Sequence, residues 1–136
     1  MSVFKQFETD PGLVEKGIWV DLGEEAGEWL LAFAGEGNKE YQRELEKRLR
    51  PYRVAMDVGS VMMNERVQKI VQEVWAEKIV LGWKGVIGDD KQPIEFTKAN
   101  VMMVFDRAPA LWQRLARIAT DHQNYLKSAL QAALKN

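Results

Sequence analysis

The sequence has 136 residues, a formal net charge of −1 and no cysteine. The missing cysteines exclude disulfides, thiolate nucleophiles and thiolate metal sites, and the near-zero charge gives no overall field for attracting DNA or acidic membranes. No apolar run approaches the roughly 20 residues that span a bilayer, and the first residues lack the pattern of a signal peptide. We expect a single domain over residues 1–136, in the cytoplasm and without a cofactor.

The charges are unevenly distributed along the chain. Residues 1–37 hold eight acidic and two basic side chains, whereas residues 107–136 hold five basic and one acidic. An acidic beginning and a basic end can meet within one protomer or between neighbours of a homo-oligomer, and the sequence leaves both open.

Two short runs near the N-terminus predict a β-hairpin. Residues 17–22 and 28–33 are rich in Trp, Val, Ile and Phe, and the five residues between them have glycine at both ends. A helix over residues 24–33 is the alternative, because Glu, Ala and Leu are good helix formers. Residues 1–16 are expected to be a loose N-terminal arm, with a turn at Asp10-Pro11-Gly12.

The next predicted element is a helix that begins after Asn38, a good N-cap residue. Tyr41, Leu45 and Leu49 recur at four-residue spacing and form its apolar stripe. Pro51 ends or kinks this helix, because proline lacks the backbone N–H that the next turn needs.

This helix also carries the one patch that resembles a nucleic-acid site. Its basic residues are Arg43, Lys47, Arg48, Arg50 and Arg53, with Tyr41 and Tyr52 nearby. Glu40, Glu44 and Glu46 are interleaved with them, at spacings typical of an ion-paired, solvated face. We interpret the patch first as structural surface, then as a protein-binding surface and last as a nucleic-acid site. Arg43, Lys47 and Arg50 are its candidate partner-binding residues.

A long helix is predicted from its start between Ser60 and Asn64 to about residue 79, because apolar residues recur there at three- and four-residue spacing. Two glycines in residues 80–86 interrupt this pattern. We therefore expect Trp83 to lie in a tight loop and to pack on the helix over residues 66–80.

Two more helices are predicted towards the C-terminus. Thr97 is placed to cap a short helix over about residues 98–105, and Pro109 fits the first turn of the last helix. Apolar residues continue along one face of that helix nearly to the end, where residues 130–136 are expected to be frayed. The predicted fold is mainly α, of the α+β class, with an N-terminal β-hairpin followed by a bundle of about four helices.

No group of residues has the pattern of a catalytic or metal site. His122 is the only histidine and has no cysteine or carboxylate at a ligand spacing, so we interpret it as structural. Asp89 and Asp90 are followed by Lys-Gln-Pro in place of alternating oxygen ligands, which indicates a solvated turn. We expect no enzymatic activity; an enzyme with an unrecognised site is the least favoured alternative.

Methionine and tryptophan give the remaining signal for binding. Methionine suits surfaces that accommodate varied apolar partners, and methionines cluster at two predicted helix starts. We add Met62, Met63 and Trp112 to the candidate partner-binding residues. Packing in the core is the alternative for such residues.

Several short motifs occur in a fixed order. They are Ala32-Phe33-Ala34-Gly35, Asn38-Lys39-Glu40-Tyr41, Leu81-Gly82-Trp83-Lys84-Gly85-Val86 and Pro93-Ile94-Glu95-Phe96-Thr97. Over about residues 17–126, this order of hairpin, Ala-Gly-Asn step, tryptophan loop and capped helix resembles the tail assembly chaperones of long-tailed bacteriophages and prophages. The chain departs from that pattern at Lys91, where the family often has glycine.

The resemblance implies a non-enzymatic protein of the host bacterial cytoplasm that is absent from the mature virion. Its implied partner is the tape-measure protein, which it keeps soluble while tail-tube subunits assemble around it. A longer form made by translational frameshift would reach the tail-tube protein, and the codons for residues 134–136 can be written as a slippery run. Neither nucleic acid nor membrane is an implied partner. The alternative is a small nucleic-acid-binding regulatory protein that uses the basic helix around residues 39–53.

Overall fold

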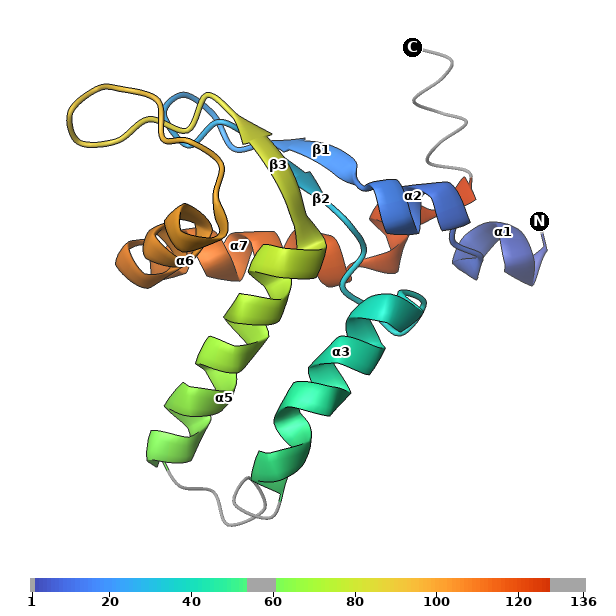
Figure 1. The fold of residues 1–136 in the computed structure, drawn as a ribbon. Helices are drawn as coiled ribbons and strands as arrows, with labels where there is room; N and C mark the ends of the chain where they lie inside the picture. The colour runs from blue at the N-terminus through green and yellow to red at the C-terminus, as the bar shows by residue number, and fades with distance from the viewer. Residues whose placement is uncertain (1, 54–60, 128–136) are drawn as a thin grey trace.

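The computed structural model describes residues 2–53 and 61–127, and it combines helices with a three-stranded antiparallel sheet (Figure 1). The α-helices are α1 (Val3–Phe7), α2 (Pro11–Lys16), α3 (Lys39–Leu49), α5 (Val61–Val74), α6 (Lys98–Arg107) and α7 (Pro109–Thr120). The strands are β1 (Ile18–Asp21), β2 (Glu28–Leu31) and β3 (Val80–Lys84), and the short helical turns are η1 (Arg50–Tyr52), η2 (Trp75–Ile79) and η3 (His122–Tyr125). The predicted α+β class, with an N-terminal hairpin followed by helices, is confirmed.

The hairpin of β1 and β2 forms where it was predicted, and the alternative helix over residues 24–33 is wrong. Its turn depends on Gly27, which has a φ of +77° that side-chain-bearing residues rarely adopt. A Cβ atom at Gly27 would also overlap the carbonyl oxygen of Lys84 on the neighbouring chain segment. Glycine is therefore required here both by its backbone conformation and by the close approach of the backbone.

Residues 80–84 form strand β3, which corrects the expectation of a loop. The strand pairs with β2 in the order β1-β2-β3, with an irregular register between Leu30 and Leu31. Helix α5 continues into the π-helical turn η2 and passes directly into the strand. A short apolar run that contains glycine does not distinguish a strand from a loop, and the pairing with β2, distant in sequence, decides between them.

A series of aromatic side chains connects the sheet to the helices that lie on one side of it (Figure 1). Trp29 of β2 stacks on Phe105 of α6 with ring centroids 6.2 Å apart, and Phe105 lies 4.9 Å from Trp112 of α7. Trp112 meets Trp75 of η2 edge to face at 4.5 Å. The indole Nε1 of Trp75 donates a 3.0 Å hydrogen bond to the hydroxyl of Tyr41, so the series of aromatic side chains ends on α3.

Trp83 of β3 extends this series at the sheet. Its ring meets Trp29 edge to face at 4.7 Å and Phe96 at 5.3 Å, and its Nε1 donates to the Ile94 carbonyl oxygen at 2.8 Å. Trp83 is therefore held by packing as expected, but its neighbours differ from those predicted. The ring contacts the adjacent strand and the segment before α6, neither of which belongs to the helix over residues 66–80.

The N-terminal residues form two capped helices, so the expectation of a loose arm over residues 1–16 is wrong for the part that the structure describes. The carboxylate of Asp10 accepts hydrogen bonds from the backbone N–H groups of Gly12 and Leu13, which caps α2. Val14 of α2 is buried in a small cluster with Phe33 and Tyr125. This burial against residues distant in sequence stabilises a helix too short to persist alone.

The last long helix is shorter than predicted, because α7 ends at Thr120. The Asp121 side chain accepts from the Gln123 N–H, and the Asn124 amide donates to the Ile118 carbonyl oxygen. Short polar side chains of this kind compete with the helical backbone and end the helix. The predicted frayed segment, residues 130–136, lies outside the described residues.

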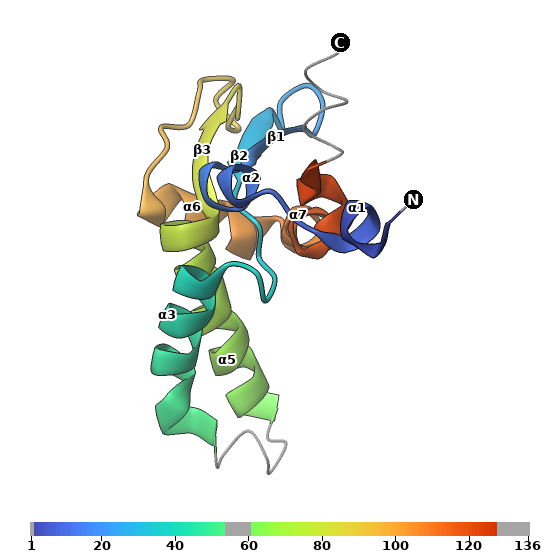
Figure 2. The ribbon, with the colours of Figure 1, turned by 90° about the vertical axis from the view of Figure 1, so that its right-hand side faces the viewer.

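Helices α3 and α5 lie side by side and project away from the sheet in both views (Figures 1 and 2). Asn38 caps α3 as predicted, accepting from the Tyr41 N–H at 3.2 Å, and α3 ends before Pro51. The predicted cap of α6 is also present, with Thr97 accepting from the Asn100 N–H, and Pro109 lies in the first turn of α7 as predicted.

Replacing Trp83 by alanine is expected to destabilise the fold by about 2–4 kcal/mol, because the side chain loses two aromatic contacts and one hydrogen bond. Urea unfolding followed by circular dichroism measures the change. Trp19→Ala is the matched control, since Trp19 is 47% exposed and should cost less than about 1 kcal/mol. Equal losses in the two variants would contradict the assigned packing of Trp83.

Replacing Gly27 by alanine is expected to cost about 1–3 kcal/mol, because the new Cβ would be forced into a positive-φ conformation and against the Lys84 carbonyl. Gly82→Ala is the control within the same sheet. A Cβ at Gly82 meets no atom within 4 Å, so this variant should be neutral or slightly stabilising. Thermal unfolding of both variants provides the test, and a more destabilised Gly82 variant would show that the sheet is packed differently.

Candidate partner-binding surfaces

The exposed side of α3 carries a row of cations. Lys39, Arg43 and Lys47 follow one another at four-residue spacing, and Arg50 lies three residues further on, so the four side chains share one side of the helix. All four residues are exposed. This side is opposite to the one where Tyr41 is buried in the core. We call these four residues the basic stripe; among the described residues, no ion pair involves any of them.

The side of α3 that faces η2 is ion-paired. Arg48 lies 2.9 Å from Glu44 on its own helix and 2.5 Å from Glu77 of η2, and Lys98 of α6 reaches Glu77 at 3.4 Å. The hydrogen bond from Arg48 is the main reason why the pKa of Glu77 is held below its ordinary value, and partial burial opposes it. The predicted ion-paired face therefore exists around Arg48, and Arg53 pairs with Glu46 at 3.3 Å. The remaining predicted cations, Arg43, Lys47 and Arg50, face solvent.

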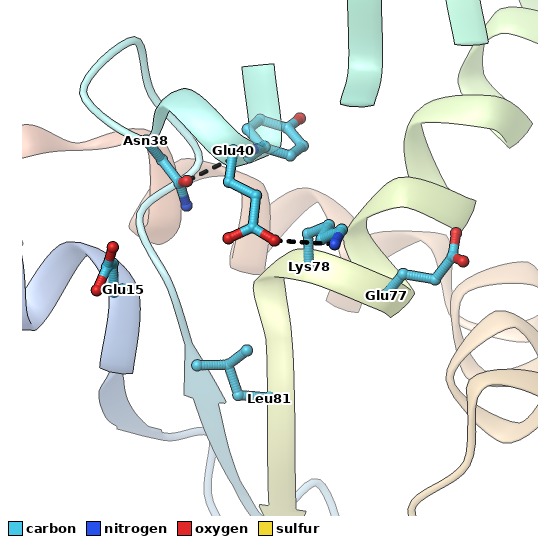
Figure 3. Close-up of a pocket in the computed structure, with 7 residues that line it drawn as sticks. Glu15, Asn38, Glu40, Glu77, Lys78 and Leu81 are labelled. Carbon is cyan, nitrogen blue, oxygen red and sulfur yellow. Dashed lines mark hydrogen bonds and ion pairs between the residues drawn. The ribbon is translucent and has the colours of Figure 1, made fainter. Parts of the chain in front are cut away.

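A pocket of about 320 Å³ lies at the base of the helical pair, between α2, α3 and the junction of η2 with β3 (Figure 3). Glu40 and Lys78 form a 3.0 Å ion pair across it, and Asn38 is held by a hydrogen bond from its side-chain amide to the Phe33 carbonyl oxygen. Burial raises the pKa of the Tyr41 hydroxyl, partly opposed by the hydrogen bond from Trp75. The side chains that line this pocket include no serine, threonine, cysteine or histidine, so its chemistry is that of a polar crevice.

The other residues considered for chemistry occupy ordinary positions. His122 stacks on Phe7 of α1 with ring centroids 5.5 Å apart. Asp89 is exposed and pairs with Arg107 at 2.6 Å, while Asp90 accepts from the Gln92 N–H within its turn. Within residues 2–53 and 61–127, no group of three or more His, Asp or Glu side chains is arranged to hold a metal ion. In the same residues, no helix has the length and apolar character needed to cross a bilayer.

Trp112 is a correction to the list of candidate binding residues. It is 9% exposed and packed between Phe105 and Trp75, so it belongs to the core and offers no surface to a partner. Its helical spacing from Leu115 and Ala119, which are also buried, is the signal that indicates this role. Met62 and Met63 lie in the first turn of α5, and their side chains are outside the described part of the structure.

The sequence did not single out one surface, the side of the sheet that faces away from α6 and α7. Trp19 lies there, 47% exposed, with the amine of Lys84 4.3 Å above its ring. The alternation of β1, in which Ile18 and Val20 are more buried than Trp19, places the tryptophan outside. This alternation can be read from sequence only once the face turned to the core is known.

A family model described as YdaY prophage protein matches residues 36–136 of the chain. Neither the curated proteins nor the solved structures include a match. The matched region begins just before α3, so it contains the helical pair, β3 and the later helices, while α1, α2, β1 and β2 precede it.

The ion pair between Arg48 and Glu77 gives a pH dependence with a definite sign. A carboxylate whose pKa is lowered by folding stabilises the protein above the pKa of the unfolded chain, and this contribution is lost as pH falls through the folded value. Glu77→Gln is therefore expected to be less stable than the wild type at pH 7, with the difference shrinking below about pH 4. Urea unfolding across this pH range measures the difference in the free energy of unfolding.

Glu65→Gln is the control, since Glu65 is exposed and no ion pair joins it to a described residue. A difference between wild type and Glu77→Gln that does not change with pH would contradict the assignment.

Proposed function

Because the chain belongs to the YdaY prophage protein family, we propose that it is a phage tail assembly chaperone that binds the tape-measure protein. It acts without enzymatic activity in the cytoplasm of the host bacterium, keeps the tape-measure protein soluble while tail-tube subunits assemble around it, and stays out of the mature virion. The prophage family and the order of motifs from the hairpin to the capped helix support this proposal.

The observation that carries the proposal is the projecting pair of helices α3 and α5 (Figure 2). The roots of the pair are fixed to the core by the contact of Tyr41 with Trp75, and its basic stripe faces solvent. A projecting helical pair offers a long surface to a second helix, and amphipathic helices are the segments that a long, helical client exposes before assembly. The basic stripe would select segments with an acidic face, and Met62 and Met63 at the start of α5 would add adaptable apolar contacts.

A longer product of the same gene and self-association are parts of this proposal. The longer form, made by frameshift near residues 134–136, would carry the additional segment that engages the tail-tube protein. A homo-oligomer would present several helical pairs to one extended client, which raises the effective concentration of binding sites.

The basic stripe also supports a second candidate, a small nucleic-acid-binding regulatory protein that uses the helix around residues 39–53. Exposed cations in a row on one helix face are the electrostatic footprint of phosphate binding. The two candidates differ in salt dependence, because binding to nucleic acid releases counterions and weakens steeply as salt rises. Titration of duplex DNA and of RNA at two salt concentrations separates them.

The chaperone function is tested by co-expressing the chain with the tape-measure protein of the same prophage and measuring the soluble fraction of the latter. We expect the wild type to raise this fraction and the double variant Arg43→Glu/Lys47→Glu to lose most of the effect, because the charge of the stripe is reversed. Arg114→Glu/Arg117→Glu is the matched control, since it makes the same charge change at exposed positions of α7.

Two results would contradict the proposal at different levels. If the wild type leaves the solubility of the tape-measure protein unchanged, the chaperone function is wrong. If both double variants lose the effect equally while remaining folded by circular dichroism, the function stands but the basic stripe is not its binding surface.

A further inference from the structure

The outer side of the sheet carries an apolar row that the rest of the described chain leaves open. Trp19, Leu30 and Gly82 lie opposite one another across β1, β2 and β3. Trp29 and Leu31 alternate with Leu30 along β2 and are fully buried, so Leu30 and its neighbours in the row point to the other face. Trp19 is 47% exposed, which is high for the largest apolar side chain.

Among the described residues, neither a positive φ nor close packing accounts for the glycine at position 82. Its φ is outside the positive range found at Gly17, Gly23, Gly27 and Gly85, and a Cβ built on it meets no atom within 4 Å. The register irregularity of β3 places its extra residue at Leu81. A glycine inside a strand costs about 0.5–1 kcal/mol, and close approach of another chain is one of the few reasons for such a residue.

A charged row lies next to the apolar row on the same face. Asp21, Glu28 and Lys84 are opposite one another in the register. They also line a hollow of about 460 Å³ at the hairpin end, together with Glu24 and Glu25. The hollow therefore has four carboxylates and one ammonium group. Glu25 has a further exposed contact, at 3.5 Å, with Lys91.

We propose that this face binds a segment of a partner protein in which a large apolar side chain is followed closely by lysine or arginine. We call it the Trp19–Gly82 face, and define it as Trp19, Asp21, Glu28, Leu30, Gly82 and Lys84. The apolar side chain covers Trp19 and occupies the space over Gly82, and the cation enters the acidic hollow. The two rows are adjacent along the strands, so side chains two residues apart in an extended segment reach both.

Charge complementarity selects this occupant. The excess of carboxylates in the hollow repels nucleic acids and acidic lipid surfaces and attracts a cationic peptide. Lys84 offsets only one of the four carboxylate charges, and its amine lies over the Trp19 ring in the manner of a cation–π contact.

The Trp19–Gly82 face is also separate from the basic stripe. Two of its three strands, β1 and β2, precede the region that matches the family model. The Trp19–Gly82 face is therefore a second binding surface, distinct from the one proposed for the tape-measure protein. It requires a basic partner segment, whereas the basic stripe requires an acidic one.

The test uses the full chain and a fluorescein-labelled synthetic peptide in which leucine and arginine lie two residues apart, with serine between them, so that an extended backbone presents both side chains on one face; binding is followed by anisotropy. Gly82→Val is the decisive variant, because it fills the space over the row without changing any charge, and the free space at Gly82 predicts that it folds. We expect it to weaken peptide binding by about tenfold or more, with unchanged or raised thermal stability. Ala99→Val, which also introduces a valine side chain, but at an exposed position of α6, should bind as the wild type does.

Further measurements decide between the possible occupants. Trp19→Ala should weaken binding as Gly82→Val does, and a peptide with glutamate in place of arginine should not bind. If Gly82→Val binds normally while Glu24→Gln/Glu28→Gln weakens binding, the attraction is unspecific and the proposal is wrong. If light scattering shows a dimer that Gly82→Val dissociates, the face belongs to a second copy of the chain and the proposal is equally overturned. These outcomes are independent of the co-expression test, which examines α3.

Discussion

The fold depends on a continuous path of aromatic side chains that runs through every layer of the molecule. Its members, in spatial order, are Trp83, Trp29, Phe105, Trp112, Trp75 and Tyr41. Each ring removes a large apolar area from water and prefers a tilted or edge-to-face neighbour, so the path fixes the angles between the sheet, α6, α7 and α3. The path also joins the root of the helical pair to the core, while the side of α3 away from the path faces solvent.

The parts of the fold that could be predicted from the sequence are those decided within a few residues. Asn38 and Thr97 mark helix starts because a cap is made between a side chain and a backbone group three residues away, and Pro109 marks one because the first turn does not need its missing N–H. The hairpin was predictable for the same reason, since its turn needs glycine at Gly23 and Gly27, both of which have positive φ. These features depend on neighbouring residues in the sequence, so contacts with distant parts of the chain did not change them.

The parts that could not be predicted are decided by distant partners. Strand β3 forms because β2 is there to pair with it, and α2 persists because Val14 is buried against Phe33 and Tyr125. The same limit applies to the candidate site. The spacing in the sequence predicts that Arg43, Lys47 and Arg50 lie as a group along one helix. Which cations face solvent, however, depends on the position of Glu77, because Glu77 pairs with Arg48. Trp112 was misassigned because residue type alone does not distinguish a core tryptophan from a surface one, whereas its helical spacing from the buried Leu115 and Ala119 does.

The structure shows where the acidic beginning and the basic end of the chain meet. The acidic beginning and the later basic residues do meet within the protomer, but at the surface pair of Glu8 with Lys127, 2.7 Å apart, beside the bridge between Thr9 and Leu126. Exposed pairs of this kind contribute little to stability, so the asymmetry is not required for folding. Apart from this pair, four carboxylates line the hollow at the hairpin end, and four cations form the basic stripe. The two proposed surfaces therefore carry opposite charge, and each would attract a partner that the other repels.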